Sequence, residues 1–302
     1  MNRKRSARLT VLLATDGSRQ AHAALAFAAA VPWAGTVTAH TVLGRGGIPL
    51  GPWPADIWVA GMSDAPDRAL KREISRVRRI VRHRWPDMTV STTNTPPIEA
   101  IIAEARRRRA GVIVVGSRGL GFASRLMLGS VSRGVVRRAG CPVLVVKGRR
   151  RRIRRVVLAT DGSLNASRAL GFLVARLEPP AGARVKVIQI LEPVLPRTRA
   201  LLPAPVRRAV LASAASLNAE RARKARREVA GAAVLLKRAG WRARGVVREG
   251  SPLAELLQEV AASRADLLVV GARGTGGLER LLLGSVAEGV LDRSAVPVLL
   301  VK

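Results

Sequence analysis

Two short segments that combine hydroxyls, a carboxylate and glycines each occur twice in this chain of 302 residues. Ala-Thr-Asp-Gly-Ser occupies residues 14–18 and returns at 159–163. Gly-x2-Gly-x9-Gly-Ser occupies residues 116–130 and returns at 271–285. A carboxylate accepts hydrogen bonds from sugar hydroxyls, and glycines let backbone amides approach an anion closely. The two segments together therefore indicate a ligand that carries both hydroxyls and phosphate.

The glycine segment suits phosphate through its main chain. Gly116 and Gly119 flank a turn where no β-carbon keeps a ligand away. Gly129 and Ser130 then open a predicted helix, whose free N–H groups and dipole favour negative charge. The Ser130 hydroxyl is a further donor or a helix cap, and both roles are compatible. The corresponding residues of the second copy are Gly271, Gly274, Gly284 and Ser285.

Arginines within the glycine segment add positive charge. Arg118 and Arg273 occupy equivalent positions in the two copies. Arg125 and Arg280 are also equivalent, among the nine residues that separate the second glycine from the third. Each guanidinium either contacts a phosphate oxygen or faces solvent, and the sequence leaves both interpretations open.

Asp16 and Asp161 follow the first predicted strand of each half. Taken alone, an aspartate in Thr-Asp-Gly-Ser is more readily a turn or helix-cap residue than a ligand contact. Its recurrence together with the glycine segment, in both halves, favours a contact with ribose hydroxyls. Two other nucleotide motifs are missing from the sequence, the P-loop spacing Gly-x4-Gly-Lys-Ser/Thr and a Gly-x-Gly-x-x-Gly directly after the first strand.

A duplicated α/β unit positions these segments. In each half, aliphatic runs alternate with helical stretches, and several runs are apolar throughout, which predicts a parallel sheet covered on both faces. The predicted strands span residues 11–14, 36–42, 88–92, 112–115 and 143–146, then 156–159, 185–191, 243–248, 267–270 and 298–301. The predicted helices span residues 19–30, 70–81, 98–108 and 131–138, then 167–177, 217–238, 252–263 and 286–293. The expected fold class is α/β, with two tandem domains that each hold a five-stranded parallel sheet and helices on both faces.

The repeat also sets the expected domain boundaries. Residues 1–148 form the first domain, residues 149–155 a basic linker and residues 156–302 the second domain. In open parallel sheets, ligands bind beyond the carboxyl ends of the strands. Both repeated segments begin at such ends, so we expect the fold to bring each aspartate close to its glycine segment.

The formal net charge is +33, and most of the basic residues are arginines. Such a field attracts nucleic acid or another acidic partner, although arginine stripes on solvated helix faces explain it as well. No apolar run is long enough to cross a bilayer, and the basic N-terminus lacks the apolar stretch of a signal peptide, so we expect a cytoplasmic protein. The irregular stretch 44–66 carries Trp53 and Trp58, which either pack on their own domain or seat a partner.

The Asp-Gly-Ser segment early in each half, the glycine segment late in it and a closing run that begins Pro-Val-Leu resemble the universal stress protein family, here as a tandem pair that covers nearly the whole chain. The resemblance implies two Rossmann-like domains of the adenine nucleotide α-hydrolase type. It also implies that both glycine segments bind ATP, with or without Mg²⁺. Family members pair through their last strands, which implies an internal pseudo-dimer with residues 143–146 beside residues 298–301. A further homodimer stays open.

The resemblance assigns roles to individual residues. It implies that Asp16 and Asp161 contact the ribose, and that the second strand offers Ile190 to the adenine in one half and Thr41 in the other. The implied adenine-lining residues are Ala14, Thr15, Ala159 and Thr160. The implied phosphate site comprises Gly116, Arg118, Gly119, Gly129, Ser130 and Val131, and in the second half Gly271, Arg273, Gly274, Gly284, Ser285 and Val286.

Hydrolysis of ATP needs a base that activates water and a metal that neutralises the leaving charge. Neither repeated segment carries a histidine, and His22, His40 and His83 have no counterparts in the other half. We therefore expect a nucleotide-dependent stress-response module with little or no turnover, no catalytic residue and no metal site formed by side chains. A nucleic-acid or polyphosphate binder that uses the arginine surface is one alternative, and a slow ATPase is another. An adenylating enzyme would need a catalytic lysine near the phosphates, which the segments lack.

Overall fold

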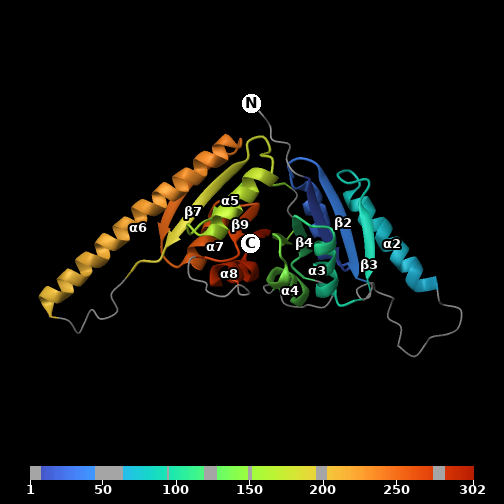
Figure 1. Cartoon of the computed structure of the whole chain (residues 1–302), viewed down its shortest axis with the longest axis horizontal. Helices are drawn as coiled ribbons and strands as arrows, with labels where there is room; N and C mark the ends of the chain where they lie inside the picture. Colours follow the sequence, from blue (N-terminus) through green and yellow to red (C-terminus); the bar gives the residue numbers. More distant parts are fainter. Residues whose placement is uncertain are drawn as a thin grey trace.

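The computed structural model describes residues 8–44, 64–93, 95–118, 128–148, 152–194, 203–274 and 283–302. Strands and helices alternate along both halves of the chain (Figure 1). The elements of the first half are β1 (Leu9–Thr15), α1 (Arg19–Ala30), β2 (Val37–Gly44), α2 (Asp64–Val81), β3 (Thr89–Thr93), α3 (Pro97–Arg107), β4 (Val112–Gly116), α4 (Ser130–Arg138) and β5 (Val143–Val146). Those of the second half are β6 (Arg155–Ala159), α5 (Leu164–Arg176), β7 (Arg184–Leu191), α6 (Ala204–Arg238), β8 (Arg242–Glu249), α7 (Pro252–Ala262), β9 (Leu267–Gly271), α8 (Ser285–Arg293) and β10 (Val298–Val301).

The strands form one ten-stranded sheet in the order β3-β2-β1-β4-β5-β10-β9-β6-β7-β8. Pairing is parallel within each half, and β5 and β10 join the halves by antiparallel pairing, with Leu144 opposite Leu299. The predicted α/β fold and the predicted pairing of the last strands are both confirmed. The pairing makes the two five-stranded sheets continuous, so neither β5 nor β10 is left as an exposed edge strand.

Two apolar layers cover the sheet, one on each face. Helices α1, α2, α5 and α6 bury residues such as Phe27 and Leu236 against one face, and helices α3, α4, α7 and α8 bury residues such as Val135 and Val290 against the other. Side chains alternate along β10, so Leu299 lies in the first layer and Leu300 in the second. Each layer contains residues from both halves, so the hydrophobic core runs without interruption through the join.

A second backbone contact between the halves lies after α1 and α5. Trp33 and Leu177 form an isolated antiparallel bridge, and the Ala34 N–H donates to Arg176 O at 2.9 Å. The Trp33 side chain is 2% exposed, and its indole Nε1 donates to Ala28 O at 2.9 Å. This tryptophan therefore packs within the protein. Trp53 and Trp58 lie outside the described residues.

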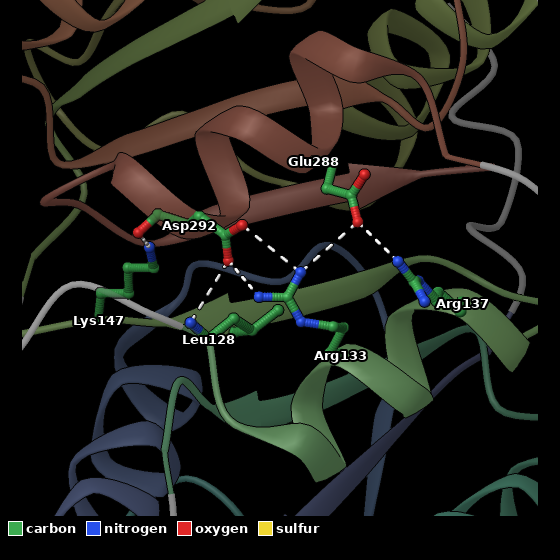
Figure 2. A network of polar contacts seen from close by, with 6 residues as sticks. All are labelled: Leu128, Arg133, Arg137, Lys147, Glu288 and Asp292. Atoms are coloured by element: carbon green, nitrogen blue, oxygen red, sulfur yellow. Dashed lines mark hydrogen bonds and ion pairs between the residues drawn. The ribbon is translucent and has the colours of Figure 1, made fainter. Parts of the chain in front are cut away.

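A polar network closes the other side of the join, between α4 and α8 (Figure 2). Arg133 Nη2 lies 2.7 Å from Asp292 Oδ1, and Arg137 Nη2 lies 2.7 Å from Glu288 Oε1. Arg133 and Glu288 occupy the same position of the repeat, as do Arg137 and Asp292, because α4 and α8 begin at equivalent serines. The join thus pairs a basic helix with an acidic one, whereas two first halves would set arginine against arginine.

Helix α6 is the main difference from the predicted elements. The apolar pattern predicts a helix over residues 217–238, and the structure begins it at Ala204. The added turns are rich in alanine, and a proline in the first turn of a helix costs no hydrogen bond. Figure 1 shows the start of α6 extending well beyond the sheet. Among the described residues, no helix is long and apolar enough to cross a membrane.

The α4–α8 network yields a test of the join. We expect Arg133→Glu to lower the free energy of unfolding by roughly 1–2 kcal/mol, because it places a third carboxylate beside Glu288 and Asp292. The exchange Arg133→Glu with Asp292→Arg restores an opposite-charge pair and should recover at least half of that loss. Denaturant unfolding of both single variants and the double variant measures the coupling. Strictly additive losses would show that the pair contributes nothing to the join.

Candidate functional site

The two Asp-Gly-Ser turns have the same geometry. Asp16 Oδ1 accepts a hydrogen bond from the Ser18 N–H at 3.0 Å, and Asp161 Oδ1 accepts one from the Ser163 N–H at 3.0 Å. The intervening glycine in the second half, Gly162, has a φ of 77°, a left-handed conformation that favours glycine. One oxygen of each aspartate therefore stabilises the turn, which is the turn role that the sequence offered as an alternative for these aspartates.

The other oxygen of Asp161 faces the glycine segment. Asp161 Oδ2 lies so close to Gly274 that a β-carbon on this glycine would collide with it. More than 100 residues separate the two along the chain. The fold brings them together because β6 and β9 are adjacent parallel strands whose carboxyl ends share one edge of the sheet. The aspartate and the glycine segment of the second half thus form one rim.

A cavity of about 850 Å³ opens at this rim. It lies above the ends of β6, β7 and β9 and reaches the first turns of α7 and α8. The structure brings together there the second-half site residues that the resemblance implies, namely Ala159, Thr160, Asp161, Ile190, Gly271, Arg273, Gly274, Gly284, Ser285 and Val286.

The first turn of α8 points its backbone N–H groups toward this cavity. Gly284 is the N-cap, and no side chain caps the helix. The next three residues, Ser285, Val286 and Ala287, all line the cavity. The first N–H groups of a helix have no partner within the helix, and the helix dipole adds partial positive charge. This end of the cavity is therefore chemically suited to an anion.

The glycines of the second copy serve two purposes. A β-carbon on Gly271 would lie 2.8 Å from the Asn165 carbonyl carbon and 2.9 Å from the Ala166 nitrogen, so this glycine is required for α5 to pack against β9. A β-carbon on Gly284 would meet nothing closer than 3.4 Å, the distance to Arg273 Cα. Gly271 is therefore needed for packing, whereas the fold tolerates a side chain at position 284.

The cavity also has residues that the sequence did not predict. The most informative is Gln189 on β7, which is 6% exposed and whose Oε1 has no hydrogen-bond partner among the described residues. Arg221 of α6 lines the same cavity and donates from Nη1 to Glu192 O at 3.0 Å. The remaining unpredicted lining residues are Ala166, Ile188, Leu191, Pro252, Leu256, Val270 and Leu283.

The first half repeats the arrangement at the backbone level. The Gly129 N–H donates to Ser117 O at 2.9 Å, as the Gly284 N–H donates to Ala272 O at 3.0 Å. Gly129 is the N-cap of α4, as Gly284 is of α8. The predicted residues Ala14, Thr15, Asp16 and Gly116 lie at the carboxyl ends of β1 and β4, followed by Arg118, and Ser130 and Val131 open α4. Gly119, Arg125 and Arg280 lie outside the described residues.

The strand register corrects one predicted equivalence. Thr41 pairs with Leu13, and the residue that pairs with the corresponding Leu158 is Val187. Thr41 therefore corresponds to Val187 and not to Ile190. The predicted equivalence was wrong by three residues along the second strand of the half. Thr41 is fully buried, and its hydroxyl lies 3.0 Å from Met88 Sδ.

Two of the three histidines, His22 and His40, contact side chains of neighbouring elements. His22 Nε2 lies 2.6 Å from Glu73 Oε1, between α1 and α2. His40 is buried on β2 and contacts the Thr89 hydroxyl, and burial together with the Arg108 charge lowers its pKa. Within the described parts of the chain, no group of three or more acidic, histidine or cysteine side chains is arranged to hold a metal ion.

Comparison with known proteins agrees with the duplicated fold. A sequence model of the universal stress protein family matches residues 8–147 and again residues 152–302. The chain belongs to the universal stress protein family. The universal stress protein Mb2028c of Mycobacterium bovis is 31% identical over 233 residues, which cover 70% of this chain and 67% of that protein.

Two further proteins match this universal stress protein over most of its length. A universal stress protein of Mycolicibacterium smegmatis is 26% identical over 270 residues, or 83% of this chain and 82% of the relative. The crystal structure of a universal stress protein from Archaeoglobus fulgidus DSM 4304 superimposes with a TM-score of 0.60 and 20% identity, and it covers 97% of this chain and 98% of its own. At that identity the likeness concerns the fold alone.

The different surroundings of the glycines yield a prediction about stability. We expect Gly271→Ala to lower the free energy of unfolding by roughly 1–3 kcal/mol, because the new methyl group overlaps the backbone of α5. Gly284→Ala should cost less, roughly 0.5–1 kcal/mol, because its methyl group has room and only the preference of the N-cap position for glycine is lost. Denaturant unfolding measures both. Equal losses for the two variants would contradict the distinction between a packing glycine and a glycine that faces the cavity.

Proposed function

We propose that this universal stress protein binds ATP at the rim of each half and acts as a nucleotide-dependent regulatory module with little or no turnover. The observation that supports the proposal is the second-half cavity of about 850 Å³, which is lined by the aspartate turn, the glycine segment and the first turn of α8. Ligand cavities of this kind usually measure roughly 300–1,000 Å³. The family resemblance of the same residues points to the same ligand.

The proposed ATP lies along the rim with its groups matched to three surfaces. The phosphates meet the N–H groups at the start of α8, together with Gly274 and Arg273. The ribose lies at Asp161, whose carboxylate accepts hydrogen bonds from the two sugar hydroxyls. The adenine then occupies the apolar part of the cavity, between Ala159 and Ile190. In the first half, the phosphates would meet the equivalent groups at Gly129, Ser130 and Val131.

A second function is favoured by the surface charge. The net charge is +33, and the outer turns of α6 expose Arg207, Arg208, Arg223, Arg226 and Arg227. A polyanion that binds such a surface releases counterions, so its affinity falls steeply as salt is added. ATP in a cavity depends much less on salt, because its contacts are few and shielded. Salt dependence thus separates a nucleic-acid binder from an ATP-binding module.

The proposed phosphate contacts yield the first test. We expect Gly284→Val to weaken ATP binding to the second half at least tenfold, about 1.4 kcal/mol, because the side chain fills the space in front of the α8 N–H groups. The combination with Gly129→Val should remove binding to both halves. Isothermal calorimetry at low and at physiological salt measures the affinities, and an assay for released phosphate measures turnover.

The control for this experiment is Gly231→Val on α6, because a β-carbon there meets no atom within 4 Å. It should bind ATP as the unmodified protein does. ATP binding by the double variant at the unmodified affinity would disprove the assigned phosphate site. Several turnovers a minute by the unmodified protein would disprove the regulatory assignment.

A further inference from the structure

A second, smaller cavity lies behind Arg273. Its volume is about 110 Å³, and it shares Ala272, Arg273 and Leu283 with the large cavity. The other residues that line it are Arg137, Asn165, Arg168 and Lys302. Four of the seven lining residues are basic, and none is acidic. A recess so rich in positive charge is suited to an anion.

Both halves build this small cavity. Arg137 comes from α4 of the first half, whereas Arg168 lies on α5 of the second. Lys302, which follows β10, crosses the join, because its Nζ donates to Arg137 O at 3.2 Å and also to Ala139 O. Figure 2 shows Arg137 beside Glu288 of α8, the acid 2.7 Å from its guanidinium. The cavity therefore exists only when the two halves are joined.

The positive charges are close enough to affect one another. Burial lowers the pKa of Lys302 below its usual value, and the charge of Arg273 lowers it further, against an opposing effect of Cys141. The recess therefore gathers positive charge from four basic side chains, and their combined field attracts an anion.

The repeat provides an internal comparison. The repeat also defines an equivalent place beside the first half. There, Asp292 takes the position that Arg137 has in the recess, and Ala23 takes the position of Arg168. Lys147, the equivalent of Lys302, donates there to Asp292 O at 3.1 Å. The same framework thus carries an acid in one copy and two additional bases in the other. The basic recess is not a consequence of the shared fold.

We propose that this recess binds a small oxyanion of the phosphate class, which links the two halves next to the nucleotide cavity. A water molecule occupies about 30 Å³ of liquid, so the recess accommodates one phosphate group and excludes a nucleoside. Guanidinium groups form short, charge-assisted hydrogen bonds to phosphate oxygens. Because Arg273 lines both cavities, the phosphate group is either a free ion or the terminal group of a nucleotide that extends past it.

Arg168 gives the cleanest test of this site. It lines the recess and not the nucleotide cavity, and its hydrogen bond to Asn165, a neighbour on the same helix, is long at 3.5 Å. Isothermal calorimetry with inorganic phosphate at physiological salt compares the unmodified protein with Arg168→Gln. We expect about tenfold weaker binding, because one charge-assisted contact is lost. The control is Arg226→Gln, which removes an equal charge from an exposed position on α6 and should change nothing.

ATP distinguishes the two sources of phosphate. If phosphate still binds when ATP is saturating, and Arg168→Gln weakens only phosphate, the ligand is the free ion. If ATP displaces phosphate and Arg168→Gln weakens ATP as well, the ligand is the nucleotide's own terminal group. Both results support the site. The proposal is overturned if Arg168→Gln binds phosphate and ATP as Arg226→Gln does. Gly284→Val then tells whether the ATP cavity fails too, because Gly284 lines the nucleotide cavity and not the recess.

Discussion

The antiparallel pairing of β5 with β10 is the interaction on which the rest of the architecture depends. Each half alone would end in an exposed strand edge with unpaired N–H and C=O groups. Pairing these edges makes one sheet of ten strands and carries both apolar layers across the join. It also fixes where the neighbouring helices lie, since α4 and α8 are the elements that come immediately before β5 and β10 in the chain. The polar network and the basic recess both follow from that placement.

Duplication fixes the backbone and leaves the charges free to differ. The Asp-Gly-Ser turns superimpose hydrogen bond for hydrogen bond, and Gly129 and Gly284 cap their helices in the same way. At the join, however, equivalent positions face one another across an approximate twofold axis, so identical charges there would repel. Opposite charges at equivalent positions, such as Arg137 and Asp292, relieve this repulsion. The same asymmetry concentrates positive charge beside the rim of the second half.

The sequence predicted the strands of each half and the residues gathered at the second-half rim well, because both rest on local patterns that recur. Apolar runs mark the strands, and the carboxyl ends of parallel strands must share an edge. It did not predict Gln189 or Arg221, because their roles depend on which neighbours they meet. It also misaligned Thr41 with Ile190, because these short aliphatic strands carry no distinctive residue that fixes their register against the neighbouring strand. The sequence did not predict the first turns of α6, residues 204–216, because exposed alanine-rich turns carry no apolar periodicity.

Arg273 connects the rim to the join. It follows β9, which lies between β6, the strand that carries the aspartate turn, and β10, the strand that pairs with the first half. Arg273 lines the large cavity on one side and the recess on the other. An anion in the large cavity would therefore change the electrostatic free energy of binding an anion in the recess, where Lys302 contacts α4. A phosphate in the recess would bind only the joined form and would therefore stabilise the join by mass action. If both proposed sites are occupied as argued, nucleotide binding and the association of the two halves would be linked through shared charge, without a requirement for large movements of the backbone.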